Sequence, residues 1–518
     1  MRNISKIFIA ASLVAFASCE PEFENPVEDF QATSGDADFS RYVALGNSLT
    51  SGFTDNALFI SGQQNSYPNM IATQMAMAGG GSFSQPLMPD EIGGFSNFGV
   101  AGKLTLQIVN GGLSPVPTPA ESPFTPASGA PFNNMGVPGA KSFHLLANGY
   151  GNPAGIATGQ ANPYFARMAS SANASVLEDA VAQNPTFFTL WIGNNDVLSY
   201  ATSGGIGTDQ TGNADPTTYS SNDITDPTLY AGVLQNILEV LRNQVGAKGA
   251  IANIPSVTDI PYFTTVPYAP LSPANPTFGP MIPTLNAFYG QLNQVFDYLG
   301  QPDRKVSFST DAASAVVIKD KDLADLSAQI TAVLMGSGMD QATATLLGMT
   351  YGQSRQATAA DLMVFTSQTV IGQVDQTRVA QLMGMGVPQD QAIQMSISGI
   401  TYPLADQWVL TENETAKVKA ATQKYNLTIK QLALAYDLAL VDGHTAMQQL
   451  SSDSGITYFG NTYTTTYVTG GAFSLDGVHL TGKGYAVVAN YFIDAINTKY
   501  GSTLRNVNPN NYPGVIIP

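Results

Sequence analysis

The stretch YVALGNSLTSGFTDN, residues 42–56, joins a short apolar run to a serine set among glycines and polar turn-forming residues. The run from Arg41 to Asn47 is rich in β-forming residues and ends in Gly-Asn, which predicts a buried parallel strand. In open α/β sheets, ligand sites lie beyond the carboxyl ends of the strands. Ser48 therefore stands where such a fold exposes a nucleophile, although a serine at this place can also simply start a helix.

Three more apolar runs close in turn-forming residues, and each predicts a strand: 185–193 (PTFFTLWIG), 246–257 (GAKGAIANIPSV) and 437–443 (DLALVDG). Helical patterns separate them. Apolar residues at three- and four-residue spacing run from Leu229 towards the strand at 246–257. Thr411 and Glu414 form a capping-box signature that starts a long helix before the last strand. Strands that alternate with helices predict an α/β fold, with a parallel sheet covered by helices on both faces.

Two segments interrupt this alternation. Residues 53–131 hold Gly-rich and Pro-rich stretches, whose prolines oppose regular structure and predict a long surface excursion. Residues 261–403 are rich in Met, Ala and Gln and have helical periodicity. Within them, 332–352 and 380–402 share the pattern helix, glycine break, helix. One interpretation is a Met-rich lid over an apolar ligand; we favour a helical insertion that uses Met as ordinary core.

The composition indicates a globular protein with a large core, because the 518 residues are 44% hydrophobic and only 11% charged. The formal net charge of -17 opposes binding to nucleic-acid phosphates or anionic headgroups, since both need clustered Lys and Arg. We therefore expect no nucleic-acid partner, and we attribute the acidity mainly to solubility.

Residues 1–19 have the layout of an export signal. Arg2 and Lys6 precede an apolar stretch from Ile7 to Phe16 that is too short to span a bilayer, and small residues lead to Cys19, the only cysteine. A cysteine at this place fits the lipidated residue of a bacterial lipoprotein. The alternative is a cleaved secretory peptide with an incidental cysteine.

The remaining chain divides into three parts on this interpretation. Residues 20–40 are acidic and predict a flexible tether, 41–503 form the folded domain with its insertions at about 53–131 and 261–403, and 504–518 form a C-terminal tail. Without disulfides, stability rests on packing. The acidic residues after Cys19 fit export to the outer leaflet in some Gram-negative groups, so we expect a lipid-anchored protein of the outer membrane or cell surface.

Three histidines could act as a base for Ser48. His144 lies in a short apolar run and fits a packed or capping histidine. His444 follows a strand and has Asp442 two residues before it. The intervening Gly443 predicts a turn, so the pairing of these two side chains stays open.

His479 stands apart because Asp476 precedes it by three residues, in a Gly-containing turn before a strongly amphipathic helix. At that spacing a carboxylate can reach the imidazole Nδ1 and fix the tautomer, which leaves Nε2 free to take a proton from a serine. The alternative is that Asp476 caps the final helix and His479 is a surface residue.

Acyl transfer also needs donors aimed at a developing oxyanion. Asn195, in GNND (193–196), follows a strand end where its amide can donate, although GNND is equally a turn and helix cap. Two similar segments offer a glycine N–H: NFGVAGKLT with Gly102 and NMGVPGAKS with Gly139. We favour Gly139, because the residues after it can start a helix with free N–H groups, and keep Gly102 as the alternative.

The segments GNSL, NMGVPGA, GNND and DGVH stand in the order of the four blocks of the SGNH (GDSL-type) hydrolases, which the chain resembles from Tyr42 to about Tyr500. Those enzymes are serine esterases, lipases and acylhydrolases on a three-layer α/β/α sandwich with a central parallel sheet, a flavodoxin-like arrangement. The small members have no counterpart to the long insertions. Asn47 also departs from the family, whose first block usually has Asp before the serine.

The resemblance implies a site in which Ser48 is the nucleophile, His479 the general base and Asp476 the residue that orients it. It further implies an oxyanion hole made by the backbone N–H groups of Ser48 and Gly139 and by the Asn195 side chain. Asn is nearly isosteric with Asp, so we expect Asn47 to change the rate and pH dependence while leaving the mechanism intact.

We therefore expect a lipid-anchored serine hydrolase of carboxylic esters, with an ester or lipid ester as substrate and no cofactor. No metal is required either, because His, Cys and carboxylates do not cluster at ligand spacing. The alternatives are a non-catalytic lipoprotein that uses the fold as a binding surface, and a carbohydrate O-deacetylase. The last would need aromatic platforms at the site, for which the candidate tyrosines are scattered: Tyr262, Tyr268, Tyr463 and Tyr467.

Overall fold

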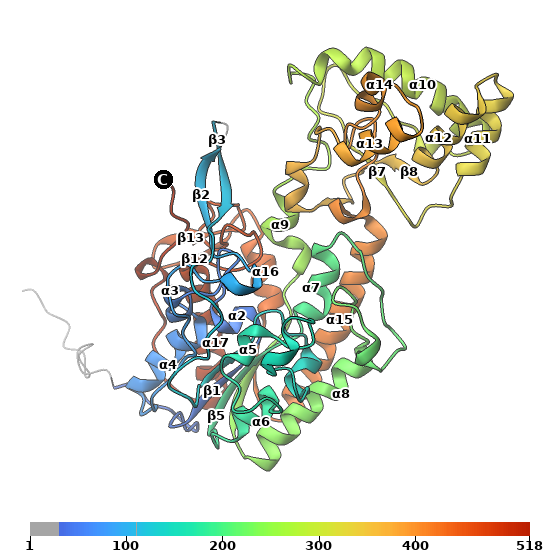
Figure 1. Cartoon of the computed structure of the whole chain (residues 1–518). Helices are drawn as coiled ribbons and strands as arrows, with labels where there is room; N and C mark the ends of the chain where they lie inside the picture. Colours follow the sequence, from blue (N-terminus) through green and yellow to red (C-terminus); the bar gives the residue numbers. More distant parts are fainter. Residues whose placement is uncertain (1–30, 110) are drawn as a thin grey trace, which may run out of the picture.

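The computed structural model describes residues 31–109 and 111–518. Its centre is a five-stranded parallel sheet in the order β11-β6-β5-β1-β4 (Figure 1). The strands are β1 (Tyr42–Gly46), β4 (Asn134–Gly136), β5 (Phe187–Trp191), β6 (Lys248–Ala252) and β11 (Ala439–Val441). Every residue of β1 and β5 is buried, as expected for central strands of a parallel sheet.

The four strands predicted from apolar runs are all present, so the prediction of an α/β fold with a parallel sheet is confirmed. The fifth strand, β4, was not predicted. Its three residues, Asn-Met-Gly, carry no run of β-forming side chains. It pairs with β1 through the register Ala44 to Asn134 and Gly46 to Gly136, so pairing in the fold, more than local propensity, defines it.

Two groups of helices flank the sheet (Figure 1). In one group, α4 (Tyr67–Met77) packs against α17 (Gly482–Tyr500). In the other, α8 (Pro227–Leu238) and α7 (Asn195–Thr202) pack against α15 (Glu412–Ala435). The capping box of Thr411 and Glu414 forms at the start of α15 as predicted. The sheet and these two groups of helices form the part that we call the base of the molecule. Its large hydrophobic core lies between the sheet and both groups of helices.

Shorter elements complete the base of the molecule. They are α2 (Ser48–Ser51), α3 (Ile60–Gln64), α5 (Pro163–Ala166), α6 (Val176–Val181), α9 (Pro261–Thr264), α16 (Gly443–Leu450), β9 (Leu362–Met363), β10 (Val409–Leu410), β12 (Ile456–Tyr458) and β13 (Asn461–Tyr463).

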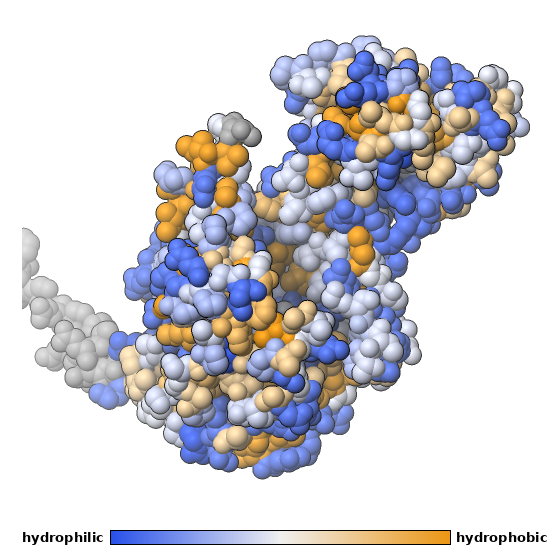
Figure 2. Space-filling view, in the orientation of Figure 1, coloured by the Kyte–Doolittle hydropathy of each residue, from blue (hydrophilic) through white to orange (hydrophobic). Residues whose placement is uncertain are grey.

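Residues 53–131 form more than the surface excursion that their prolines predicted. Helix α4 belongs to the main core, where Tyr67 and Ile71 are fully buried. Farther on, β2 (Leu104–Val109) and β3 (Gly112–Pro117) form a two-stranded hairpin with a strongly exposed Ile108. Figure 2 shows apolar surface over this hairpin. Prolines are tolerated in β3 because it pairs on one edge only.

Most of residues 261–403 form a lobe that projects from the base (Figure 1). It contains a strand pair and five helices: β7 (Val317–Lys319), β8 (Ser354–Gln356), α10 (Ile282–Tyr298), α11 (Ser327–Gly336), α12 (Gln341–Tyr351), α13 (Gln376–Gly384) and α14 (Gln389–Gln394). The lobe has a hydrophobic core separate from that of the base. Its α11–α12 and α13–α14 pairs are the two predicted helix-break-helix segments.

Methionine in the lobe fits the interpretation we favoured only in part, because Met363 is fully buried in the lobe core and Met281, Met339 and Met395 pack against it, while other methionines are exposed. Met349 is 69% exposed and Met385 is 65% exposed, and Met335 and Met383 are also exposed. The lobe core is instead built mainly of Leu, Ile, Val, Phe and Tyr. Met335, Met349 and Met383 lie on exposed faces of α11, α12 and α13, and Met385 is the C-cap residue of α13.

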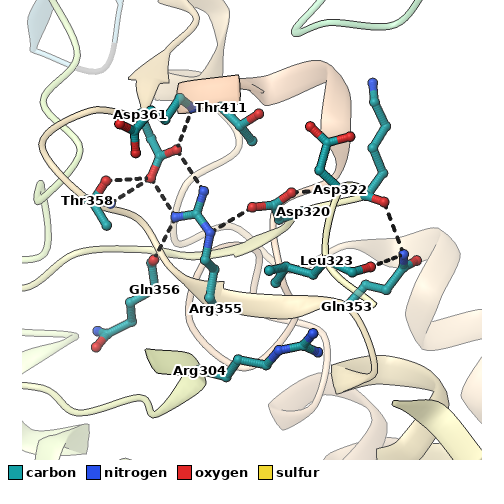
Figure 3. A network of polar contacts seen from close by, with 12 residues as sticks. Arg304, Asp320, Asp322, Leu323, Gln353, Arg355, Gln356, Thr358, Asp361 and Thr411 are labelled. Atoms are coloured by element: carbon teal, nitrogen blue, oxygen red, sulfur yellow. Dashed lines mark hydrogen bonds and ion pairs between the residues drawn. The ribbon is translucent and has the colours of Figure 1, made fainter. Parts of the chain in front are cut away.

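A buried ionic network joins the lobe to the start of α15 (Figure 3). The Arg355 guanidinium donates to both oxygens of Asp361, at 2.6 and 2.8 Å, and to Asp320 at 2.7 Å. Asp361 also accepts the backbone N–H of Glu412, the first residue of α15. The carboxylates of Asp320 and Asp361 are thus held by one cation and by backbone donors at the junction.

The folded part begins before Arg41, earlier than the composition predicted. Phe39 is buried, and the backbone N–H of Asp36 donates to Tyr500 at the end of α17. Part of the C-terminal tail is also packed, since Val507 is buried and exchanges two hydrogen bonds with Asn490. Cys19 and the export signal lie outside the described residues. Within residues 31–109 and 111–518, no helix has the length and apolarity to cross a bilayer.

Candidate active site

Ser48 is the first residue of α2, directly after strand β1. Asn47 caps the helix, because its side-chain oxygen accepts the N–H of Leu49 at 3.1 Å. A side chain at Gly46 would collide with the Trp191 carbonyl oxygen at 2.4 Å, so the tight strand-to-helix turn requires glycine there. Ser48 therefore both starts a helix and stands at the carboxyl end of a central strand.

Asn47 is 1% exposed, and its side-chain NH₂ finds no hydrogen-bond partner among the described residues. A buried donor left unpaired costs roughly 1–3 kcal/mol. The capping oxygen would be present in Asp as well as in Asn. The structure explains the capping role of this position, but not why the side chain is an amide.

His479 lies on the turn before α17 and links Ser48 to Asp476. Its Nε2 is 2.8 Å from Ser48 Oγ, and its Nδ1 is 2.8 Å from Asp476 Oδ2. An ionised carboxylate only accepts, so Nδ1 carries the proton and donates to Asp476. Nε2 is then the basic nitrogen, and the Ser48 hydroxyl donates to it. This relay can move a proton from Ser48 Oγ to the imidazole.

The Asp476 carboxylate is held by several donors besides His479 Nδ1. Its Oδ1 accepts the backbone N–H groups of Val478 and His479 at 2.8 and 2.7 Å, and its Oδ2 accepts that of Asn56 at 2.9 Å. Burial by itself would raise the pKa of Asp476, but His479 and these N–H donors outweigh it and hold the pKa well below its usual range. Asp476 therefore stays ionised beside the imidazole.

Residues Asp55 and Asn56 fasten the Asp476 turn, and sequence reasoning missed them. Asp55 Oδ1 accepts the N–H of Leu475 at 3.0 Å, and the Asp55 N–H donates to Ser474 Oγ at 3.0 Å. Both Asp55 and Asn56 have positive φ, 50° and 62°. Asp-Asn is a pair that tolerates this region, which was the available sequence signal. Burial raises the pKa of Asp55 to about 6.

The segments of Asn195 and Gly139 are fastened to each other. Asn195 is the first residue of α7, and its Nδ2 donates to the Ala140 carbonyl at 2.9 Å. The Asp196 carboxylate accepts the N–H and hydroxyl of Ser142 at 2.9 and 2.7 Å. Asn195 lines the same pocket as Ser48 and His479, with a second amide proton not used by Ala140.

Gly139 and Gly102 differ in the state of their N–H groups. Gly139 has φ of 80°, and no hydrogen bond from its N–H occurs within the described part of the chain. The N–H of Gly102 already donates to the Thr118 carbonyl at 2.8 Å. Gly139 therefore has the available donor, but not for the reason expected: the following helix is a 3₁₀ helix that begins only at Ser142.

The other two histidines have structural partners. His144 Nδ1 accepts the N–H of Lys141 at 3.0 Å, and the ring stacks on Tyr150 at 4.4 Å. Burial, with the nearby charge of Lys141, lowers the pKa of His144 to about 4. His444 lies in α16 and does not pair with Asp442, which caps that helix by accepting the N–H of Thr445.

An apolar pocket opens at Ser48, His479 and Asn195. None of its lining residues comes from 261–403, so the lobe does not close over this pocket. The four tyrosines considered as sugar platforms do not line it either. Across residues 31–109 and 111–518, His, Cys, Asp and Glu form no group that could hold a metal ion.

Comparisons of the chain with protein-family models, with curated proteins and with solved structures found no match.

Proposed function

We propose that this protein is an SGNH-type serine hydrolase that cleaves carboxylic esters, exported and anchored to the outer membrane through a lipid on Cys19. The observation that carries the proposal is the continuous hydrogen-bonded relay from Ser48 through His479 to Asp476, with 2.8 Å at each step. This geometry needs no rearrangement before proton transfer, because both contacts already have hydrogen-bond length.

The position of the relay in the sheet also supports the proposal. Numbered along the chain, the five strands lie in the order 2-1-3-4-5, which is the flavodoxin-like order. The order reverses between β1 and β5, and ligands of such sheets bind outside the carboxyl ends of the strands at this point. Ser48 follows β1 and Asn195 follows β5. We therefore assign the base of the molecule to the three-layer α/β/α sandwich of that family.

In the proposed reaction, Ser48 Oγ attacks the ester carbonyl while His479 Nε2 takes its proton. The imidazolium then gives that proton to the leaving alcohol, which departs and leaves an acyl group on Ser48. Water enters and attacks the acyl carbon while His479 Nε2 takes its proton; the bond from the acyl carbon to Ser48 Oγ then breaks, His479 returns the proton to Oγ, and the carboxylic acid is released. Asp476 keeps the imidazole in the required tautomer and stabilises its positive charge.

The oxyanion formed in each half-reaction needs donors on the other side of the carbonyl carbon. We assign this task to the N–H groups of Ser48 and Gly139, neither of which has a partner in the described residues, and to the Asn195 amide. One well-aimed donor in such a site typically lowers the barrier by roughly 3 kcal/mol.

The test is hydrolysis of p-nitrophenyl acetate and butyrate by the purified protein and by two variants, Ser48→Ala and His479→Asn. We expect wild-type turnover, and a loss of at least about 10³-fold in kcat for each variant, because either change removes the relay. His444→Asn is the matched control and should keep wild-type kcat. The proposal fails if a folded wild-type protein cleaves no p-nitrophenyl ester in a series from acetate to palmitate, or if Ser48→Ala keeps wild-type turnover.

A further inference from the structure

The pocket that begins at Ser48 extends beneath α16 and α17, across the carboxyl ends of β1, β5, β6 and β11. Beyond the relay residues and three asparagines, Asn47, Asn194 and Asn195, its lining is almost wholly hydrophobic. No Asp, Glu, Lys or Arg is among the lining residues. The lining residues contributed by α16, β12 and α17 include Met447, Leu450, Ile456, Val487, Val488 and Tyr491.

We propose that this pocket binds a straight aliphatic acyl chain of about ten carbons, which makes medium-chain acyl esters the preferred substrates. The inference rests on the proposed ester hydrolysis and adds the substrate class to it. A charged or polar acyl group would lose its hydration here without finding partners. Hydrocarbon, in contrast, gains from leaving water, by about fourfold in binding for each buried methylene.

The spacing of the strands in the sheet sets the length of the acyl chain that the pocket can hold. The pocket reaches from the end of β1 to the end of β11, which is three inter-strand steps in the order β1-β5-β6-β11. At roughly 4.8 Å per step the distance is about 14 Å. An extended hydrocarbon advances about 1.25 Å per carbon for bonds of about 1.5 Å, so this distance holds about ten carbons.

The acyl side of the ester fits this pocket better than the alcohol side. Ser48 lines the pocket and stays bonded to the acyl carbon until water attacks, so the acyl chain occupies the adjoining space through both half-reactions. The alcohol departs after the first half-reaction and needs a route to solvent. Met447, Leu450 and Ile456, at most 7% exposed, form an interior wall instead of such a route.

The experiment measures kcat/KM for p-nitrophenyl esters from acetate to palmitate, below their critical micelle concentrations. For the wild type we expect a rise of about threefold to fourfold per methylene up to about ten carbons, followed by a fall. Alkyl acetates with the same chains on the alcohol side should show no such rise.

Two substitutions at Val488, on the half-buried part of α17, move the preference in opposite directions. Val488→Phe fills the pocket and should lower the decanoate-to-acetate ratio of kcat/KM at least tenfold, whereas Val488→Ala should move the optimum to longer chains. Opposite shifts cannot arise from partial unfolding. Leu427→Phe, at an exposed position of α15 away from the pocket, is the control and should leave the profile unchanged.

The outcomes separate this inference from the function on which it rests. Ser48-dependent hydrolysis of acetate without a gain from longer acyl chains would overturn the acyl pocket and leave ester hydrolysis standing. A gain only with long-chain alcohols, or the same profile in both Val488 variants, would also overturn it. If the folded wild type cleaves no ester in the series, both proposals are wrong.

Discussion

Replacing Asp476 by Asn should abolish most of the activity through the tautomer of His479, and the structure indicates which way the new amide will face. If the Asn oxygen takes the place of Oδ1, it keeps the N–H groups of Val478 and His479, and only the N–H of Asn56 loses its acceptor. The opposite orientation would leave two backbone donors unpaired. The first orientation is therefore favoured, by one buried hydrogen bond or about 1–3 kcal/mol.

In that orientation the amide NH₂ of Asp476→Asn donates to His479 Nδ1, which forces the ring proton onto Nε2. Nε2 then cannot accept the proton of Ser48, and we expect kcat to fall by about 10³- to 10⁴-fold, equivalent to about 4–5.5 kcal/mol in the barrier. The assay is steady-state hydrolysis of a p-nitrophenyl ester, with thermal unfolding to show that the variant folds.

Asp442→Asn is the matched control for this substitution, since it changes a carboxylate near His444 that caps α16 without joining the relay. We expect its kcat to stay within about threefold of wild type. A folded Asp476→Asn variant whose kcat lies within tenfold of wild type would refute the tautomer argument.

Three further predictions follow from other features of the fold. Because burial raises the pKa of Asp55 to about 6, the folded state binds the proton of this carboxyl more tightly than the unfolded state does. The free energy of unfolding should therefore fall as the pH rises from about 4 to about 6. Urea titrations across this pH range should show a smaller fall for Asp55→Asn, which lacks the titrating group. Gly139→Ala strains a residue with φ of 80° and should lower kcat at least about tenfold, with a loss of only about 1–2 kcal/mol in the free energy of unfolding. Gly102→Ala places a side chain 2.4 Å from Ile92 and should mainly lower the melting temperature. Equal effects of the two substitutions on kcat would contradict the assignment of Gly139 as an oxyanion donor. Arg355→Met leaves Asp361 and Asp320 buried without their cation and should lower the free energy of unfolding by about 3–5 kcal/mol, as measured by chemical denaturation. The folded fraction of this variant should keep the wild-type kcat. An unchanged free energy of unfolding would show that the network does not stabilise the fold.

The fold class could be predicted from sequence because four of the five strands are continuous apolar runs with polar ends. Such runs occur where a strand is covered on both faces, and turn-forming residues mark where each one stops. Strand β4 could not be found this way, since its three residues are defined by pairing with β1. Helix α4 was missed for a related reason: it lies in a segment whose Gly and Pro content describes its neighbours and not the helix itself.

The relay could be predicted because its parts lie in short local patterns, a serine after a strand and a His three residues after an Asp. What the sequence did not reveal are contacts between distant segments. Asp55 and Asn56 bind the turn of Asp476 across 420 residues, and Asn195 binds the loop of Gly139 across 55. The exposed methionines of the lobe were also mispredicted, because composition does not say which face of a short helix turns inward.

The central claim is that Ser48 is an activated nucleophile, and covalent labelling tests it most directly. Purified protein is treated with a fluorophosphonate, and the adduct is counted by intact mass and located by peptide mass spectrometry. We expect a single adduct on the peptide that contains Ser48, none in Ser48→Ala, and labelling at least about 10²-fold slower in His479→Asn. Equal labelling of wild type and Ser48→Ala, or no labelling of the folded wild type, would contradict the claim.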